Sequence, residues 1–145
     1  MTSAISAASA FLVRDLFIVG DLENQPIERL FKLYPWEWLF AEEFGKAIAQ
    51  SGTAFLEPPW RALLSNKGIL PILWEMAPNH RNLLPAFFAD DPAAKALDGQ
   101  CVAKPLYSRE GANVTMMIDG RVADSATGSY GREGMIAQGL APLPS

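Results

Sequence analysis

The stretch that decides the fold runs from Val114 to Ala123 and reads Val-Thr-Met-Met-Ile-Asp-Gly-Arg-Val-Ala. Two apolar runs flank Asp119-Gly120 within it. An Asp-Gly pair between apolar runs is the strongest short-range signal for a β-hairpin, because both turn residues accept positive φ. We therefore expect antiparallel strands over 114–118 and 121–123.

The segments on either side of this hairpin extend the strand-and-loop pattern. Cys101 to Ala103 forms a short apolar run that leads into Lys104-Pro105, and a polar loop follows over 108–113. After the hairpin come a second glycine-rich loop over 127–134 and an apolar segment over 135–143. This half of the chain therefore indicates an antiparallel sheet.

Helix signals dominate the middle of the chain. Pro35 suits the first position of a helix, where its missing N–H costs nothing, and Gly52 should end that helix. Glu42 and Lys46 should pair on its polar face. The apolar positions at helical spacing are Trp36, Leu39, Phe40, Phe44, Ala47 and Ile48.

Two more helix starts follow. Pro58-Pro59 opens a second helix after a short strand over 54–56. A short apolar helix through 73–76 should then end before Pro78, and Asp91-Pro92 supplies the N-cap and first position of another.

The N-terminal part also predicts a hairpin. Phe11 to Val19 is rich in β-formers, 21–24 supplies turn chemistry, and a second apolar run spans 27–34. We expect 1–10 to be poorly ordered and 11–145 to form a single globular unit. Hairpins combined with helices favour an α+β (mixed α/β) class, in which helices pack on an antiparallel sheet.

Composition narrows the classes of function. Half of the 145 residues are hydrophobic, which argues against intrinsic disorder. Twelve Lys+Arg against 16 Asp+Glu give a net charge of −4, and the scattered cations argue against a nucleic-acid partner. The single cysteine, Cys101, excludes a secreted disulfide scaffold. No apolar stretch reaches the roughly 18 residues of a membrane helix, so we expect a cytoplasmic protein without a membrane partner. The composition does not predict an oligomeric state.

Two lysines stand out because of their neighbours. Lys67 lies among apolar and small residues, where Gly68 and Pro71 should break the second helix. A cation at such a break either reaches water or meets an anion from outside the segment. Lys104 ends an apolar strand and precedes the loop 108–113, which can offer backbone N–H groups to a phosphate. The alternative for each is an ordinary surface lysine.

Other chemistry-bearing residues are weaker candidates. Cys101 with His80 could form a nucleophile and its base, but cysteine in an apolar strand is usually a small core residue, and His80 more simply orders a turn. The acid pairs Glu42-Glu43 and Asp90-Asp91 suit a helix surface and a helix cap. The spacing of the glycines in 127–134 does not match a dinucleotide-binding motif. We assign no catalytic residue and no metal ligand.

Five longer strings carry a family resemblance. They are 33–38 (Leu-Tyr-Pro-Trp-Glu-Trp), 57–60 (Glu-Pro-Pro-Trp), 64–71 (Leu-Ser-Asn-Lys-Gly-Ile-Leu-Pro), 82–86 (Asn-Leu-Leu-Pro-Ala) and 104–113 (Lys-Pro-Leu-Tyr-Ser-Arg-Glu-Gly-Ala-Asn). In this order they resemble the synthetase domain of glutathionylspermidine synthase and its shorter bacterial homologues, from about Phe11 to the end of the chain. The resemblance implies part of an ATP-grasp-like fold, in which ATP lies between two α+β subdomains under a flexible loop.

The resemblance also implies roles for particular residues. Lys67 and Lys104 would correspond to the family's ATP-binding lysines. The phosphate-covering loop would consist of Ser108, Arg109, Glu110, Gly111, Ala112 and Asn113. The strand that meets the adenine edge would hold Gln138, Gly139, Leu140 and Ala141. The implied cofactors are ATP and Mg²⁺, with the Mg²⁺ ligands outside this segment.

The implied reaction is ATP-dependent amide formation. ATP phosphorylates the glycine carboxylate of a glutathione-like peptide, and an amine of a polyamine then attacks the acyl phosphate. The family's Mg²⁺ ligands and an arginine near the transferring phosphate belong to a region before Phe11, so we expect a fragment with little or no ligase activity alone. Two alternatives stay open, namely a non-catalytic nucleotide-binding member and a structural subdomain of the same fold.

Overall fold

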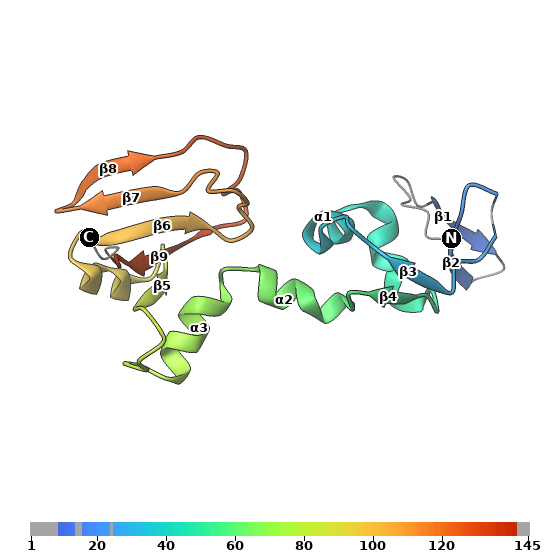
Figure 1. Ribbon diagram of the computed structural model, residues 1–145, viewed down its shortest axis with the longest axis horizontal. Helices are drawn as coiled ribbons and strands as arrows, with labels where there is room; N and C mark the ends of the chain where they lie inside the picture. The colour runs from blue at the N-terminus through green and yellow to red at the C-terminus, as the bar shows by residue number, and fades with distance from the viewer. Residues whose placement is uncertain (1–8, 14–15, 24, 142–145) are drawn as a thin grey trace. The chain divides into compact units, whose positions relative to one another are not determined.

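The computed structural model describes residues 9–13, 16–23 and 25–141. The chain folds into two compact units, Met1–Ala62 and Leu63–Ser145, which we call unit 1 and unit 2; Figure 1 labels their helices and strands. We expected 11–145 to form a single globular unit, and this stays a prediction. Of the segment 1–10 that we expect to be poorly ordered, 1–8 lies outside the described residues, and Ser9 and Ala10 belong to the first strand.

Unit 1 combines a hairpin with a strand–helix–strand segment. The antiparallel hairpin consists of β1 (Ser9–Val13) and β2 (Leu16–Gly20). The strands β3 (Arg29–Phe31) and β4 (Ala54–Leu56) pair in parallel. A parallel pair needs a long crossover, which here consists of helix α1 (Trp36–Ala41) and the 3₁₀ helix η1 (Glu43–Gln50).

The expected hairpin between 11–19 and 27–34 forms only beside its turn, and the rest of the expected pairing is wrong. The first run pairs within itself as β1 and β2, whereas the second contributes β3, which pairs with β4. The turn between the two runs does form, with the Asp21 carboxylate accepting two backbone N–H bonds of 2.9 Å. Next to it, Gly20 stands opposite Pro26, the N–H of Asp21 donates to Gln25 O at 3.0 Å, and the N–H of Ile27 donates to Val19 O at 2.8 Å.

The core of unit 1 lies between its helices and the parallel strands. Trp36, Leu39 and Ile48 are buried together, and Phe55 and Ala62 pack against them. The rings of Trp36 and Phe55 meet edge-on with their centres 5.2 Å apart.

The three tryptophans of unit 1 differ in burial. Trp36 is 3% exposed, but Trp38 is 43% and Trp60 59% exposed. The presence of tryptophan alone does not tell a buried position from an exposed one, because a single turn of α1 carries both the core-facing Trp36 and the solvent-facing Trp38.

The predicted helix from Pro35 to Gly52 is interrupted. α1 ends at Ala41, Glu42 is extended, and η1 begins at once. Gly45 explains the interruption, because a Cβ there would lie 2.2 Å from the carbonyl oxygen of Leu39. The chain turns where a residue without a side chain lets two backbone segments touch.

This interruption also removes the predicted pair of Glu42 and Lys46. Because Glu42 is no longer helical, its carboxylate accepts a hydrogen bond from the hydroxyl of Tyr34. That hydrogen bond is the main cause of the raised pKa of Tyr34.

Unit 2 is built on a five-stranded antiparallel sheet with the order β5-β9-β6-β7-β8. Its strands are β5 (Ala86–Phe88), β6 (Cys101–Pro105), β7 (Thr115–Ile118), β8 (Arg121–Ser125) and β9 (Met135–Gly139). The last strand of the chain, β9, lies between β5 and β6 (Figure 1). Together with the helices, this sheet confirms the α+β class.

Short helices connect the chain into this sheet. The 3₁₀ helix η2 (Pro59–Arg61) leads into α2 (Ala62–Ser65), and α3 (Ile69–Met76) follows after three residues. The 3₁₀ helix η3 (Pro92–Leu97) comes between β5 and β6. The expected break beside Lys67 is therefore confirmed.

Turn and cap chemistry is confirmed at two places in unit 2. Asp119 and Gly120 have φ values of 51° and 71° and join β7 to β8. The Asp91 carboxylate accepts a hydrogen bond of 2.8 Å from the N–H of Ala93, which caps η3. Among the described residues, no helix is both long and apolar enough to cross a membrane.

Candidate functional site

Lys104 and Gln138 meet across two neighbouring strands of unit 2. Lys104 on β6 stands opposite Ile136 on β9, and Val102 stands opposite Gln138. The side chains of Lys104 and Gln138 are therefore diagonal neighbours on one face of the sheet. Lys104 Nζ donates a hydrogen bond of 2.7 Å to Gln138 Oε1.

The ammonium group of Lys104 is partly buried and bonded to a neutral amide. Within the described part of the chain, no carboxylate forms an ion pair with it. Desolvation disfavours the charged form, so burial lowers the pKa of Lys104. Ile136 stands opposite Lys104 on β9 and brings no charge. A cation in these surroundings attracts an anionic ligand.

This burial predicts a pH dependence of stability. Because the folded-state pKa of Lys104 is lowered, the unfolded chain holds this proton more tightly, and stability rises with pH between the lowered pKa and the ordinary lysine value of about 10.4. We expect the free energy of unfolding of wild type, relative to that of Lys104→Met, to increase as pH rises from about 7 to about 10. Urea unfolding at both pH values measures this. Lys95→Met, at an exposed lysine, should follow wild type, and a pH-independent difference for Lys104→Met would contradict the prediction.

Lys67 lies in the gap between α2 and α3 and bonds to the segment that follows β6. Its backbone N–H donates to Leu106 O at 2.9 Å, and its Nζ donates to Ser108 O at 2.6 Å. A tight turn shapes the gap, with Asn66 Oδ1 accepting from the N–H of Gly68 at 2.8 Å. Gly68 is buried, and a Cβ there would lie 3.4 Å from the Leu106 side chain. Close packing therefore places Lys67 at the start of the predicted phosphate-covering loop.

The loop 108–113 begins buried and becomes exposed. Ser108 is 9% exposed, whereas Arg109, Glu110 and Gly111 are exposed. Glu110 and Gly111 have φ values of 51° and 77°. Within the described residues, the backbone N–H groups of Glu110 and Gly111 find no acceptor. Exposed N–H groups of this kind can bond to phosphate oxygens or to water.

A second loop, 127–134, packs against the end of the first, and the sequence analysis missed this contact. Asn113 Oδ1 accepts a hydrogen bond of 3.0 Å from the N–H of Tyr130. A Cβ at Gly128 would lie 2.7 Å from Ala112 Cβ. The available signal was the glycine content of this loop, which we used only to exclude a dinucleotide motif.

The residues predicted to meet adenine run along β9 and past its end. The N–H of Gly139 donates to Pro85 O at 2.7 Å, and the N–H of Leu140 donates to Gln100 O at 3.1 Å. Neighbouring segments on both sides therefore occupy these donors, whereas Ala141 is exposed. Adenine binding at 138–141 stays a prediction.

Cys101 and His80 lie in different environments. Cys101 is 8% exposed on β6, and burial raises the pKa of its thiol. His80 is exposed, and its Nδ1 accepts a hydrogen bond of 3.3 Å from the N–H of Asn82. The described residues hold no cluster of three or more His, Cys, Asp or Glu side chains that could bind a metal ion.

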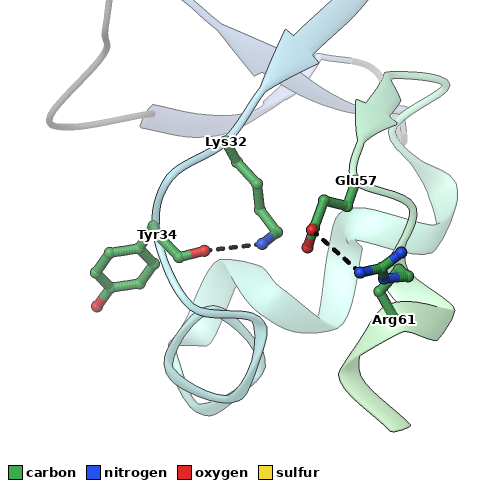
Figure 2. Close-up of polar contacts among 4 residues, drawn as sticks. All are labelled: Lys32, Tyr34, Glu57 and Arg61. Atoms are coloured by element: carbon green, nitrogen blue, oxygen red, sulfur yellow. Dashed lines mark hydrogen bonds and ion pairs between the residues drawn. The ribbon is translucent and has the colours of Figure 1, made fainter. Parts of the chain in front are cut away.

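Unit 1 carries a polar cluster that the sequence analysis did not single out. Lys32 follows β3 and Glu57 follows β4, at the carboxyl ends of the parallel pair. Lys32 Nζ donates a hydrogen bond of 2.9 Å to Tyr34 O, and Arg61 forms an ion pair of 3.7 Å with Glu57 (Figure 2). Lys32 Nζ also lies 4.3 Å from the centre of the Trp36 ring. The ion pair is about half exposed and therefore adds little stability. The contacts of Lys32 with Tyr34 O and with the Trp36 ring lie at the start of α1, and we interpret them as an anchor for that helix.

Comparison with known proteins adds a second line of argument. The family model described as glutathionylspermidine synthase preATP-grasp matches residues 11–145. A putative acid–amine ligase of Haemophilus influenzae is 47% identical over 131 residues, which cover 86% of this chain and 33% of that protein. The bifunctional glutathionylspermidine synthetase/amidase of Escherichia coli is 38% identical over 90 residues, covering 61% of this chain and 14% of that protein. Glutathionylspermidine synthase of Crithidia fasciculata is 36% identical over 112 residues, covering 68% of this chain and 15% of that protein. The chain thus spans about a third or less of the length of these relatives.

Proposed function

This chain belongs to the glutathionylspermidine synthase pre-ATP-grasp family, and we propose that it supplies the nucleotide-holding part of an ATP-dependent carboxylate–amine ligase. The proposed reaction activates the glycine carboxylate of a glutathione-like peptide as an acyl phosphate, which an amine of a polyamine then attacks. Because the chain covers 33% or less of its relatives, we assign this reaction to a longer polypeptide and expect these 145 residues alone to be inactive.

One observation carries the proposal, namely the partly buried Lys104 ammonium bonded to a neutral amide. The hydrogen bond to Gln138 Oε1 orients the ammonium but leaves its positive charge uncompensated. Keeping such a charge costs stability unless an anion binds there. A phosphate of ATP meets this need, and the family membership favours ATP over other anions.

The neighbouring residues suit the same ligand. Lys67 brings a second cation to Ser108, and the exposed N–H groups of Glu110 and Gly111 provide hydrogen-bond donors. A carboxylate is a poor electrophile, and cations placed around a phosphoryl group stabilise the charge that moves during its transfer. Mg²⁺ would add further positive charge to the nucleotide phosphates, with ligands outside this chain.

The test is the affinity of the chain for Mg-ATP. We expect Lys67→Ala and Lys104→Ala each to weaken Mg-ATP binding about tenfold, because a charge-assisted hydrogen bond contributes roughly 1.5–3 kcal/mol. Isothermal titration calorimetry of wild type and both variants measures this. Lys95→Ala removes the same charge at an exposed site and should bind as wild type does. Unchanged affinity in both site variants would refute the nucleotide site.

A nucleotide-binding role without catalysis is the second candidate, because the contacts of Lys67 and Lys104 would serve the binding of ATP whether or not a reaction follows. Release of ADP by the longer polypeptide separates the two candidates. Release that depends on both a thiol peptide and a polyamine supports the ligase, whereas Mg-ATP binding with no turnover on any amine supports the non-catalytic role.

A further inference from the structure

The side chain of Gln138 is held in place by strands on both sides. β9 is an inner strand, and Gln138 stands opposite Ala86 of β5 and Val102 of β6. Ala86 is 1% and Gln138 9% exposed. A side chain confined in this way has few alternative rotamers, so its amide presents one fixed acceptor to Lys104.

The chemistry of the acceptor matters as much as its position. A carboxylate at 138 would form an ion pair with Lys104 and satisfy its charge within the protein. An amide oxygen accepts the same hydrogen bond without carrying a charge. Glutamine therefore fixes the direction of the ammonium and leaves its positive charge for a ligand.

We propose that Gln138 is a positioning residue, which holds Lys104 Nζ through the 2.7 Å hydrogen bond so that the ammonium meets the phosphates of a nucleotide. This inference rests on the proposed nucleotide site and deepens it. It assigns to the Gln138 side chain an effect on phosphate binding that is transmitted through Lys104. Reading of the adenine base would instead require the side chain to contact the base itself.

Two substitutions separate these roles. Gln138→Glu keeps the size and the hydrogen bond but adds the charge, whereas Gln138→Leu removes the hydrogen bond. We expect Gln138→Glu to weaken Mg-ATP binding about tenfold, and Gln138→Leu to weaken it less, because the lysine keeps its charge there. Adenosine has no phosphate, so its affinity should change less than about twofold in both variants if Gln138 acts through Lys104.

A second readout tests the contact without any nucleotide. Nuclear magnetic resonance titration of lysine side chains in the complete chain, with Lys104→Met to assign the signal, follows the Lys104 pKa directly. That pKa should rise in Gln138→Glu, where a carboxylate favours the charged form, and fall in Gln138→Leu, where the acceptor is lost. Gln50→Glu makes the same chemical change at an exposed position in unit 1 and should leave the Lys104 pKa and both affinities unchanged.

The outcomes are distinct. Equal losses of Mg-ATP and adenosine affinity would overturn the positioning role and favour a reader of the base. An identical Lys104 pKa in wild type and both variants would overturn the contact itself. A wild-type chain that binds no Mg-ATP would refute the proposed function, and the Lys104 pKa would then still decide whether Gln138 holds the amine.

Discussion

Gly45→Ala should lower the free energy of unfolding of unit 1 by about 3 kcal/mol. A methyl group at this position would lie 2.2 Å from Leu39 O and 2.9 Å from the Cα of Phe40, and both are backbone atoms of α1. Backbone cannot rotate away as a side chain can, so α1 and η1 would have to separate. Leu39 belongs to the core with Trp36 and Ile48, and separation would open that core.

Urea unfolding followed by tryptophan fluorescence measures this loss, because three of the four tryptophans, Trp36, Trp38 and Trp60, lie in unit 1. Gly52→Ala is the matched control. Gly52 has a φ of 69°, but nothing lies within 4 Å of the place that an added methyl group would take, so alanine there should cost only the backbone strain of about 1 kcal/mol. Equal losses in the two variants would show that the close approach at Gly45 does not limit stability.

Local chemistry predicted the parts of the fold that depend on a few adjacent residues. Asp119-Gly120 makes its turn because both residues adopt positive φ, and Asp91 caps η3 through its own carboxylate. The break beside Lys67 likewise follows from residues within four positions of it. In each case the atoms that decide the structure are also close in sequence.

Pairing between distant segments was not predictable in the same way. The parallel pair of β3 and β4 and the insertion of β9 between β5 and β6 join segments that lie far apart in sequence. β5 itself is only three residues long, and its apolar pattern alone does not distinguish a strand from a loop end. Which segments pair depends on the whole packed unit rather than on local propensity.

The candidate site was likewise predictable in its local features and not in its long-range contacts. The isolation of Lys67 and Lys104 among apolar residues was visible in the sequence, and both lysines do make specific hydrogen bonds. Their partners were not visible as partners, because Ser108 and Gln138 are 41 and 34 residues away. The packing of 127–134 on the loop 108–113 was missed for the same reason.

That missed contact leads to the second large effect, the loss expected in Gly128→Ala. A methyl group here would lie 2.5 Å from Asn113 Oδ1 and 2.7 Å from Ala112 Cβ. Asn113 would have to turn away and release its hydrogen bond to the N–H of Tyr130. We expect unit 2 to lose about 2–3 kcal/mol of unfolding free energy, from overpacking together with a lost hydrogen bond. Urea unfolding followed by far-ultraviolet circular dichroism measures the change.

A double-mutant cycle shows whether the loops act on each other through this contact. Ala112→Gly removes the methyl group that the new side chain would meet, so adding it to Gly128→Ala should restore about 1 kcal/mol of the loss. Gly111→Ala is the control, because its φ of 77° costs backbone strain but nothing lies within 4 Å of the added methyl group. If the loop 108–113 also covers phosphates, Gly128→Ala should weaken Mg-ATP binding and Ala112→Gly should partly restore it. Additive stability losses in the double variant would contradict the coupling, because the 2.7 Å approach of the two methyl positions would then carry no energy.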